Sequence, residues 1–194
     1  GLADGYFILP YTISDYMSWL PKEQPSAEQV EFKEAETETK ARINRILTGS
    51  GKRTATSIHR ELGALMIDAC GMARSEAGLK DALEKIPQIR EQFYEHVAVP
   101  ADSNVMNAAL EQAGRVADYL EFAEVMCHDA LARDESCGAH FRVEHQTEFG
   151  EAVRNDEEYC NVSAWEFAGT DKAPMLHTEP LELETVELAV RNYR

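Results

Sequence analysis

The longest run of helically spaced apolar residues lies in the second half of the chain and predicts a helix over residues 104–133. Its apolar positions recur every three or four residues and form one stripe: Ala113, Val116, Ala117, Leu120, Ala123, Cys127, Ala130 and Leu131. Three larger residues, Tyr119, Phe122 and Met126, form a second stripe on another side. Because a helix with apolar residues on more than one side is usually covered by several neighbours, we expect it to be the central helix of a bundle.

Two further amphipathic helices precede it. The first is predicted over residues 56–74, and the second over residues 75–97, with a serine at its start that is suited to capping. Pro87 lies inside the second pattern and removes a backbone hydrogen bond, so a bend is expected near Glu84. A turn and a cap at residues 100–103 would lead into the central helix. Three long helices joined by short turns predict a mainly α fold, an up-and-down antiparallel three-helix bundle.

The N-terminal part of the chain has two different patterns. Residues 1–20 are dense in aromatic side chains and predict a helix that kinks or breaks at Pro10. After a short linker, residues 26–29 resemble a capping box, and a highly charged helix follows to about Thr48. Its apolar residues are few, so we expect it to be mostly solvated, and the glycines of residues 49–51 are expected to end it.

The helical period is lost after Glu135. Residues 158–167 alternate β-branched and aromatic side chains with polar ones and predict a strand, followed by a turn at residues 169–172. Residues 181–188 alternate over part of their length, but their leucines fit a short helix equally well. The expected domains are therefore a terminal helix, a helical bundle domain and a small irregular, β-containing tail, over residues 1–20, 21–134 and 135–194.

Composition narrows the possible functions. The net charge of −16 argues against a nucleic-acid binder and against adhesion to an anionic membrane surface. Four scattered cysteines do not form a disulfide framework and fit a reducing cytoplasmic compartment. No run approaches the roughly 20 apolar residues of a membrane span, so direct membrane insertion is not expected. The chain opens inside an apolar helix without a methionine, which favours an excised fragment of a longer polypeptide.

A metal site is one candidate for the region that ends the central helix. Its thiols and imidazoles are Cys127, His128, Cys137 and His140. A tetrahedral zinc site needs two closely spaced ligand pairs, and only Cys137 and His140 have that spacing. Cys127 and His128 are adjacent on a helix and point about 100° apart, so they cannot easily share an ion. Buried thiols and a hydrogen-bonded histidine are therefore the favoured interpretation.

A catalytic Cys–His–Asp set is a second candidate. It would combine Cys137 and His140 with Asp134 or Asp156, but no feature of the sequence activates the thiol. A phosphate-binding loop is also missing, because no Gly-x-Gly-x-x-Gly motif follows a strand. Neither pattern supports a reactive site in this chain.

A structural role fits these residues better. After the central helix, the imidazole of His140 can satisfy free carbonyl groups at the helix end. Arg142 and Arg154 are surrounded by carboxylates and are expected to be ion-pair anchors that fix the tail to the bundle. The carboxylates in question are Asp134, Glu135, Asp156, Glu157 and Glu158.

The stretch LEFAEVMCHDALARDESCGAHFR, residues 120–142, resembles the end of the helical domain of succinate dehydrogenase and fumarate reductase flavoprotein subunits. These proteins typically carry Glu-Ser-Arg-Gly-Ala-His-x-Arg after a long helix. Cys137 stands where many members have arginine, as in a branch found with bacterial di-haem membrane anchors. The opening GLADGYFILPYTISDYMSWL is similar to the helix that ends the flavin domain of that branch. Asn155 departs from a later Arg-Asp-Asp pattern of the family.

The resemblance implies a spectrin-repeat-like three-helix bundle and a parent enzyme that exchanges hydride between succinate or fumarate and FAD. It implies that the flavin-binding domain of the same chain covers residues 1–20. The implied partners are an iron–sulfur subunit and, through it, a membrane anchor subunit with a quinone site, which places the protein peripherally on the cytoplasmic face of the membrane. The family's catalytic and flavin-binding residues all precede Gly1. We therefore expect no catalytic, cofactor-binding or metal-binding residue in this chain, no bound FAD and no activity of its own.

Two alternatives stay open at this point. One is a stand-alone acidic helical interaction module. The other is the C-terminal part of an L-aspartate oxidase, which shares the domain plan and a similar Glu-Ser-Arg-Gly motif. The physiological direction, succinate oxidation or fumarate reduction, is not decided by the sequence.

Overall fold

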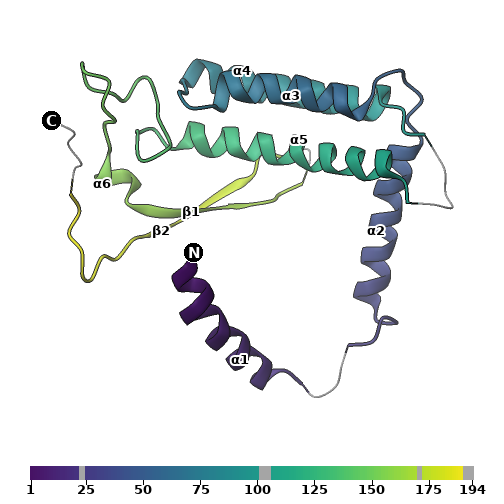
Figure 1. The fold of residues 1–194 in the computed structure, drawn as a ribbon, viewed down its shortest axis with the longest axis horizontal. Coiled ribbons are helices and arrows are strands. Elements are labelled where there is room, and N and C mark those ends of the chain that lie inside the picture. Colours follow the sequence, from purple (N-terminus) through teal and green to yellow (C-terminus); the bar gives the residue numbers. More distant parts are fainter. Residues whose placement is uncertain (22–24, 101–105, 170–171, 190–194) are drawn as a thin grey trace. The chain divides into compact units, whose positions relative to one another are not determined.

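The computed structural model describes residues 1–21, 25–100, 106–169 and 172–189. The chain divides into two compact units, Gly1–Arg42 and Ile43–Arg194 (Figure 1). This division differs from the three domains expected from the sequence, whose boundaries stay a prediction. Among the described helices, none is long and apolar enough to cross a membrane.

The N-terminal unit is helical, as predicted. A π-helix, η1 (Asp4–Ile8), leads into α1 (Leu9–Trp19), so the helical geometry changes next to Pro10. Proline is tolerated in the first turn of α1 because the N–H that it lacks would have no partner there. Large apolar side chains of this segment are exposed, with Tyr6 at 72% and Trp19 at 86%.

The charged helix α2 (Val30–Leu47) begins later than the capping-box pattern predicted. Ser26 and its neighbours form a turn instead, in which the Ser26 hydroxyl accepts a hydrogen bond from the Glu28 N–H. The helix is exposed except near its C-terminal end, where Ile46 is buried. It ends before Gly49 as expected, and a Cβ at Gly49 would lie 2.1 Å from the Val97 carbonyl oxygen, so only glycine fits there.

Three helices form the predicted bundle: α3 (Ala55–Cys70), α4 (Glu76–His96) and α5 (Ala108–Ala132) (Figure 1). Side-chain caps begin α3 and α4, because the Thr54 and Ser75 hydroxyls accept from the N–H groups of Ser57 and Gly78. The core between the helices is apolar and includes Ile58, Leu62, Leu79, Ile86, Phe93, Val116 and Leu120.

The two stripes of α5 differ in burial. The small-residue stripe is buried from Ala113 to Ala130, as predicted. The second stripe is not covered: Tyr119, Phe122 and Met126 are 41%, 64% and 37% exposed. The expectation that neighbours cover α5 on more than one side is therefore wrong for this stripe within the described residues.

The start of α5 and the path of α4 around Pro87 are compared with the predictions as follows. The helix α5 begins at Ala108 with Asn107 as its cap, four residues later than predicted, and the expected cap in residues 101–103 lies outside the described residues. The helix α4 continues through Pro87, and the Gln88 side chain donates to the Glu84 carbonyl at 3.1 Å. The bend expected near Glu84 stays a prediction.

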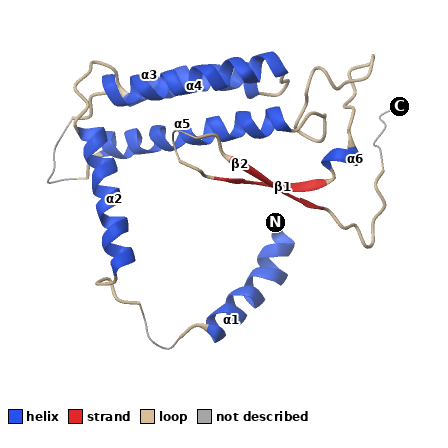
Figure 2. Ribbon diagram, turned by 180° about the vertical axis from the view of Figure 1, so that it is seen from behind, coloured by secondary structure: helices blue, strands red, loops and turns tan. Residues whose placement is uncertain are grey.

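The tail carries a two-stranded antiparallel sheet. Strand β1 (Asn161–Glu166) pairs with β2 (Met175–Pro180), with Asn161 opposite Pro180 and Glu166 opposite Met175. Figure 2 shows the hairpin on the side of α5 that faces away from α3 and α4. The strand predicted over residues 158–167 starts later, because a short helix, α6 (Asp156–Tyr159), precedes it.

The second strand was missed by the sequence patterns. Residues 181–188 form neither the strand nor the helix that they allowed. The pairing partner of β1 is the segment just before them, in which every residue is exposed. A strand without a buried face has no hydrophobic alternation, so its sequence lacks the period that would have identified it.

Candidate functional site at the junction of bundle and tail

The C-terminal end of α5 is covered by the segment that follows it, and His140 is central to this junction. Its Nε2 lies 2.8 Å from the Arg133 carbonyl oxygen, and its Nδ1 lies 2.9 Å from the Arg74 guanidinium. Because arginine can only donate, Nδ1 accepts and Nε2 carries the proton that is donated to the carbonyl. The predicted role of His140 at the helix end is confirmed. Burial lowers the pKa of His140, and the neighbouring arginines act in the same direction, against the hydrogen bond to the Arg133 carbonyl.

Arg142 is the most deeply buried charged residue of the junction, with 1% of its surface exposed. Its guanidinium donates to the carbonyl oxygens of Ala130 at 3.2 Å and Leu131 at 3.5 Å. It also forms ion pairs with Asp134 at 3.3 Å and Glu144 at 3.2 Å. A cation at this position satisfies terminal carbonyls and interacts favourably with the negative end of the helix dipole. Arg142 is therefore the anchor that the sequence predicted.

A tight turn brings these residues back to the helix. The backbone groups of Cys137 and His140 exchange two hydrogen bonds of 2.8 and 3.1 Å, and Gly138 between them has a φ of +59°. The buried Ser136 hydroxyl accepts from the Arg142 N–H at 2.8 Å and donates to the Arg142 carbonyl at 3.1 Å. Positive φ favours glycine, so Gly138 allows the reversal that places His140 and Arg142 against α5.

The junction also contacts the turn between α3 and α4. The Arg74 N–H donates to the Phe141 carbonyl, and the Val143 N–H donates to the Arg74 carbonyl, both at 2.9 Å. The Glu144 carboxylate accepts from the Glu76 N–H at the start of α4. The segment after α5 is thus fixed to α5, to the start of α4 and to the turn between α3 and α4.

A second set of ion pairs fixes the rest of the tail. Glu135 is 2% exposed, and its carboxylate lies 2.9 Å from the Arg133 guanidinium and accepts from the Asn155 N–H at 2.8 Å. Arg154 pairs with Asp156 at 2.8 Å, as expected, and donates to the Ala189 carbonyl at 3.0 Å. These contacts connect α5 to the segment that precedes the hairpin.

The remaining acidic residues have a different role from the one expected. Glu157 and Glu158 lie in the short helix α6, and the Glu158 carboxylate accepts from the Asn155 side chain at 3.0 Å. The Asn155 side chain caps that helix by accepting from the Glu158 N–H. Asn155, at the position where the family pattern has an acidic residue, therefore acts as the N-terminal cap of α6.

The structure does not assemble the catalytic set considered from the sequence. Both ring nitrogens of His140 are engaged, by Arg74 and by Arg133, so neither is left to accept a proton from Cys137. The Cys137 residue is exposed, and Asp134 pairs with Arg142 and with His145. The residues of the set thus serve the junction instead.

Among the four candidate metal ligands, Cys127 and His128 contact different residues. Cys127 is buried beside Met66, whereas His128 lies 6.1 Å from the Trp165 ring, measured between ring centroids. Within the described ranges, no group of three or more His, Cys, Asp or Glu side chains is arranged to hold a metal.

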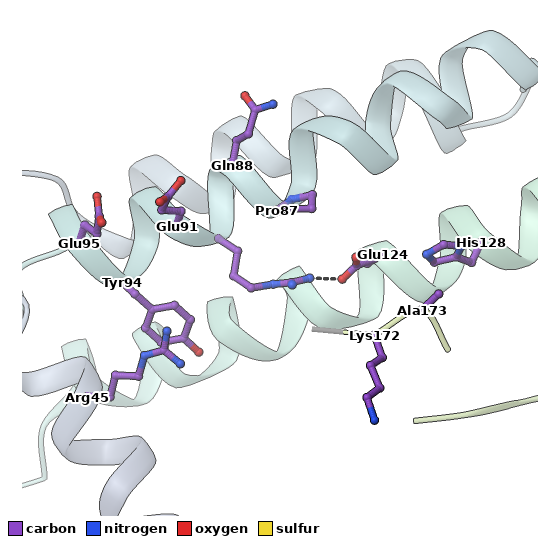
Figure 3. Close-up of a pocket in the computed structure, with 11 residues that line it drawn as sticks. Arg45, Pro87, Gln88, Glu91, Tyr94, Glu95, Glu124, His128, Lys172 and Ala173 are labelled. Atoms are coloured by element: carbon purple, nitrogen blue, oxygen red, sulfur yellow. Dashed lines mark hydrogen bonds and ion pairs between the residues drawn. The ribbon is translucent and has the colours of Figure 1, made fainter. Parts of the chain in front are cut away.

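A groove of about 690 Å³ lies beside α4 and α5 (Figure 3). An ion pair between Arg90 and Glu124 crosses it, and the Arg45 guanidinium stacks 3.6 Å from the centroid of the Tyr94 ring. The charged residues that line the groove have both signs. The sequence did not single out these residues, because they lie on the polar faces of helices and belong to no recognisable motif.

Comparison with known proteins identifies the chain. Residues 59–193 match the family model described as "Fumarate reductase flavoprotein C-term". The chain belongs to this family. The match confirms the resemblance seen around residues 120–142, and it favours the flavoprotein family over a stand-alone module or an L-aspartate oxidase.

Curated relatives agree with this assignment. The chain is 26% identical over 153 residues to the fumarate reductase flavoprotein subunit of Haemophilus influenzae, covering 79% of this chain and 24% of that protein. It is 27% identical over 152 residues to the corresponding Escherichia coli subunit, covering 78% and 24%. It is 27% identical over 153 residues to the succinate dehydrogenase flavoprotein subunit of Rickettsia bellii, covering 78% and 24%. The chain spans about a quarter of the length of these relatives.

Solved structures share the fold of this member of the flavoprotein family. A variant of the Escherichia coli quinol fumarate reductase chain FrdA matches with a TM-score of 0.71 at 23% identity, covering 86% of this chain and 27% of that one. The Mycobacterium smegmatis Sdh1 complex matches with a TM-score of 0.66 at 22% identity, covering 88% and 27%. The three-helix bundle with a small β-containing tail is therefore the fold of the C-terminal region of these chains.

Proposed function

We propose that this chain is the C-terminal part of a flavoprotein subunit that interconverts succinate and fumarate. Its role is to support the FAD-binding domain and to offer surface to partner subunits. The observation that carries this proposal is the use of the family motif: Ser136, His140 and Arg142 all serve to fix the end of α5. A motif whose polar groups are all used for packing and capping supports a mechanical role rather than a chemical one.

The chemistry belongs, on this proposal, to the part of the parent protein that precedes this chain. FAD binds there and accepts hydride from succinate or donates it to fumarate, since the cofactor supplies the chemistry and the protein orients it. This chain contributes no catalytic, FAD-binding or metal ligand to that reaction. The relatives are named flavoprotein subunits, and the chain spans 24% of their length, which leaves room for such a domain.

The exposed N-terminal helix supports this division of roles. Tyr6, Phe7, Tyr11 and Trp19 are between 70% and 86% exposed. Aromatic side chains bury large apolar areas, so a segment that exposes four of them is typical of a surface that another part of the protein covers. We propose that the FAD-binding domain of the parent chain covers residues 1–20.

The parent subunit is also proposed to work in a membrane-associated complex. One of the solved structures with the same fold is a "Quinol-Fumarate Reductase with Menaquinol Molecules", with a TM-score of 0.69 at 23% identity. By analogy with such complexes, an iron–sulfur subunit takes the electrons, and a membrane anchor subunit passes them to or from quinone. The location is then the cytoplasmic face of the membrane, reached through the partners rather than through this chain.

Expression of the parent protein in two pieces tests the proposal. The 194-residue chain alone is expected to purify without flavin absorbance and without fumarate reduction by a reduced dye. The preceding piece alone is expected to lose FAD, and co-expression with this chain is expected to restore both FAD content and turnover. Flavin bound by the 194-residue chain, or full FAD content of the other piece without it, would contradict the supporting role.

A further inference from the structure

A groove between α3 and α5 has an uncovered apolar wall. The wall is the second stripe of α5, in which Tyr119, Phe122 and Met126 are 41%, 64% and 37% exposed. Met66 lies on the α3 side, and the groove has a volume of about 210 Å³. None of the described residues that line it is an acidic residue, a lysine or an arginine. Apolar side chains of this kind gain free energy when another element buries them.

A glycine in the same groove points to a closely packed neighbour. Gly63 lies in the middle of α3, where glycine destabilises a helix relative to alanine. A Cβ at Gly63 would meet no atom of the described structure within 4 Å, and its φ is not positive, so nothing in this chain requires glycine there. Gly114 of α5 is equally open but does not line the groove. What distinguishes Gly63 is its place beside the apolar wall, where a missing side chain lets another backbone approach.

The dimensions of the groove suit a short helix. Its α3 side runs from His59 to Cys70, about 11 residues, which is about 16 Å at the helical rise and equals about three turns. Beyond His59, the Gln112 amide donates to the Thr56 hydroxyl at 3.1 Å and links the two helices. A helix satisfies its own backbone hydrogen bonds, whereas an extended segment would need donors and acceptors that apolar walls do not offer.

The charge of the chain argues against a second copy as the occupant. Each copy has a net charge of −16, and a net charge far from zero keeps proteins apart. Two copies joined through this groove would bring like charges together, with no charged residue in the groove itself to offset the repulsion.

The composition of the groove is typical of an interface that stays covered. Interface cores are depleted of charged residues and enriched in aromatic residues and methionine, and permanent interfaces are the more hydrophobic ones. The chain spans 24% of the length of its curated relatives, so about three quarters of such a polypeptide lies outside it. A domain of the same polypeptide is present at a high effective concentration, so it can dock without charged side chains to attract it.

We propose that the groove between α3 and α5 receives a helix of about three turns from the FAD-binding domain that precedes this chain in the parent protein. The inference rests on the proposed supporting role and names a surface that provides it, in addition to residues 1–20. The docked helix presents apolar residues at three- and four-residue spacing to Phe122 and Met66, and its backbone approaches α3 at Gly63.

Copurification tests the groove, with the tagged 194-residue chain co-expressed with the untagged preceding part of the parent protein. The wild-type chain is expected to retain that part. Gly63→Leu fills the space beside the wall, and Phe122→Ala removes the most exposed wall residue. Each is expected to lower the retained amount by more than about tenfold, as truncation of a central interface aromatic does. The matched control is Phe167→Ala: Phe167 is 69% exposed and does not line this groove, so retention like that of the wild type is expected.

Thermal melting of the 194-residue chain alone separates docking from folding. Gly63→Leu is expected to raise the melting temperature by about 3 °C, because leucine favours a helix and its Cβ meets open space. Phe122→Ala is expected to shift it by less than about 1 °C, since the side chain is mostly exposed. A Gly63 variant that is more stable alone and yet retains less of the preceding part shows that the groove serves docking. If Gly63→Leu lowers the melting temperature instead, Phe122→Ala decides.

The possible failures are distinguishable. If the wild-type chain does not retain the preceding part, the proposed supporting role itself is contradicted. If the wild type retains it and Phe122→Ala retains as much, or if Phe167→Ala loses as much as Phe122→Ala, the groove is not the docking surface. Sedimentation of the 194-residue chain alone checks the remaining occupant: a dimer that Phe122→Ala abolishes would assign the groove to a second copy and overturn the proposal.

Discussion

The two ends of α5 are secured in different ways. At the start, Asn107 works locally: its side chain accepts from the Leu110 N–H at 3.0 Å and donates to the Pro100 carbonyl at 2.7 Å. At the other end, the terminal carbonyls are satisfied by His140 and Arg142, which return to the helix through a turn. One end depends on a single neighbouring side chain, and the other on a folded segment.

The difference shows where the tail derives its stability. A capping side chain replaces one water contact of the helix and remains partly solvated, so its contribution is small. Arg142 is buried, and its removal would leave carbonyl groups in a place that water does not reach. We therefore expect the C-terminal end to be the more costly one to disturb, and the following predictions test this ranking from the largest effect to the smallest.

The middle of α5 provides the reference for both ends. Leu120 is fully buried, and Leu120→Ala is expected to lower the free energy of unfolding by about 3 kcal/mol, as for other leucines removed from a core. Phe122→Ser is the control on the same helix, because Phe122 is 64% exposed, and its effect should stay within about 0.5 kcal/mol. Urea unfolding of both variants measures the contrast, and equal effects would mean that something covers the second stripe in solution.

The C-terminal end is broken by Arg142→Met, which keeps much of the side-chain length but donates nothing. We expect a loss of about 2 kcal/mol in unfolding free energy, since hydrogen bonds from a charged group to buried carbonyls are lost. Arg154→Met is the matched control: its side chain is 24% exposed and pairs with Asp156, so a loss below about 1 kcal/mol is expected. Denaturant titration monitored by helicity gives both values. Equal losses would show that burial does not distinguish the two anchors.

This contrast also explains which parts the sequence could predict. The three bundle helices follow from apolar spacing, because each buries one stripe against the others. The roles of His140 and Arg142 could be inferred because they closely follow a long helix whose end needs donors. The exposure of Tyr119, Phe122 and Met126 could not be inferred from the sequence. A stripe of apolar residues has the same spacing whether or not another element covers it.

Other differences arose at the start of α5 and in the tail. The helix α5 begins four residues later than predicted, with Asn107 as its cap. The strand β2 was missed because an exposed strand has no apolar period. Contacts between distant positions depend on how the helices pack, which one sequence does not state.

The N-terminal end of α5 is tested by Asn107→Ala. Loss of the cap is expected to lower the unfolding free energy by about 1 kcal/mol, less than Arg142→Met. Asn107→Asp is the control, because its carboxylate can still accept from the Leu110 N–H and favours the positive end of the helix dipole. Thermal unfolding of the wild type, Asn107→Ala and Asn107→Asp ranks the three proteins by stability. A loss in Asn107→Ala that exceeds the loss in Arg142→Met would reverse the proposed ranking of the two ends.

The smallest expected effect is a pH dependence at the C-terminal end. Burial, helped by the adjacent arginines, lowers the pKa of His140 in the folded state below the ordinary value of 6.5, so the unfolded chain binds a proton more readily there. Stability from the neutral imidazole is therefore fully present above that value and decreases as the pH falls below it.

His140→Gln cannot titrate and should show a flatter decrease in unfolding free energy between neutral and mildly acidic pH. Comparing the two slopes isolates His140 from the other histidines, because these are common to both proteins. Identical slopes would mean that the pKa of His140 is the same in the folded and the unfolded chain. A steeper slope for the variant would mean that folding raises the pKa of His140 instead of lowering it.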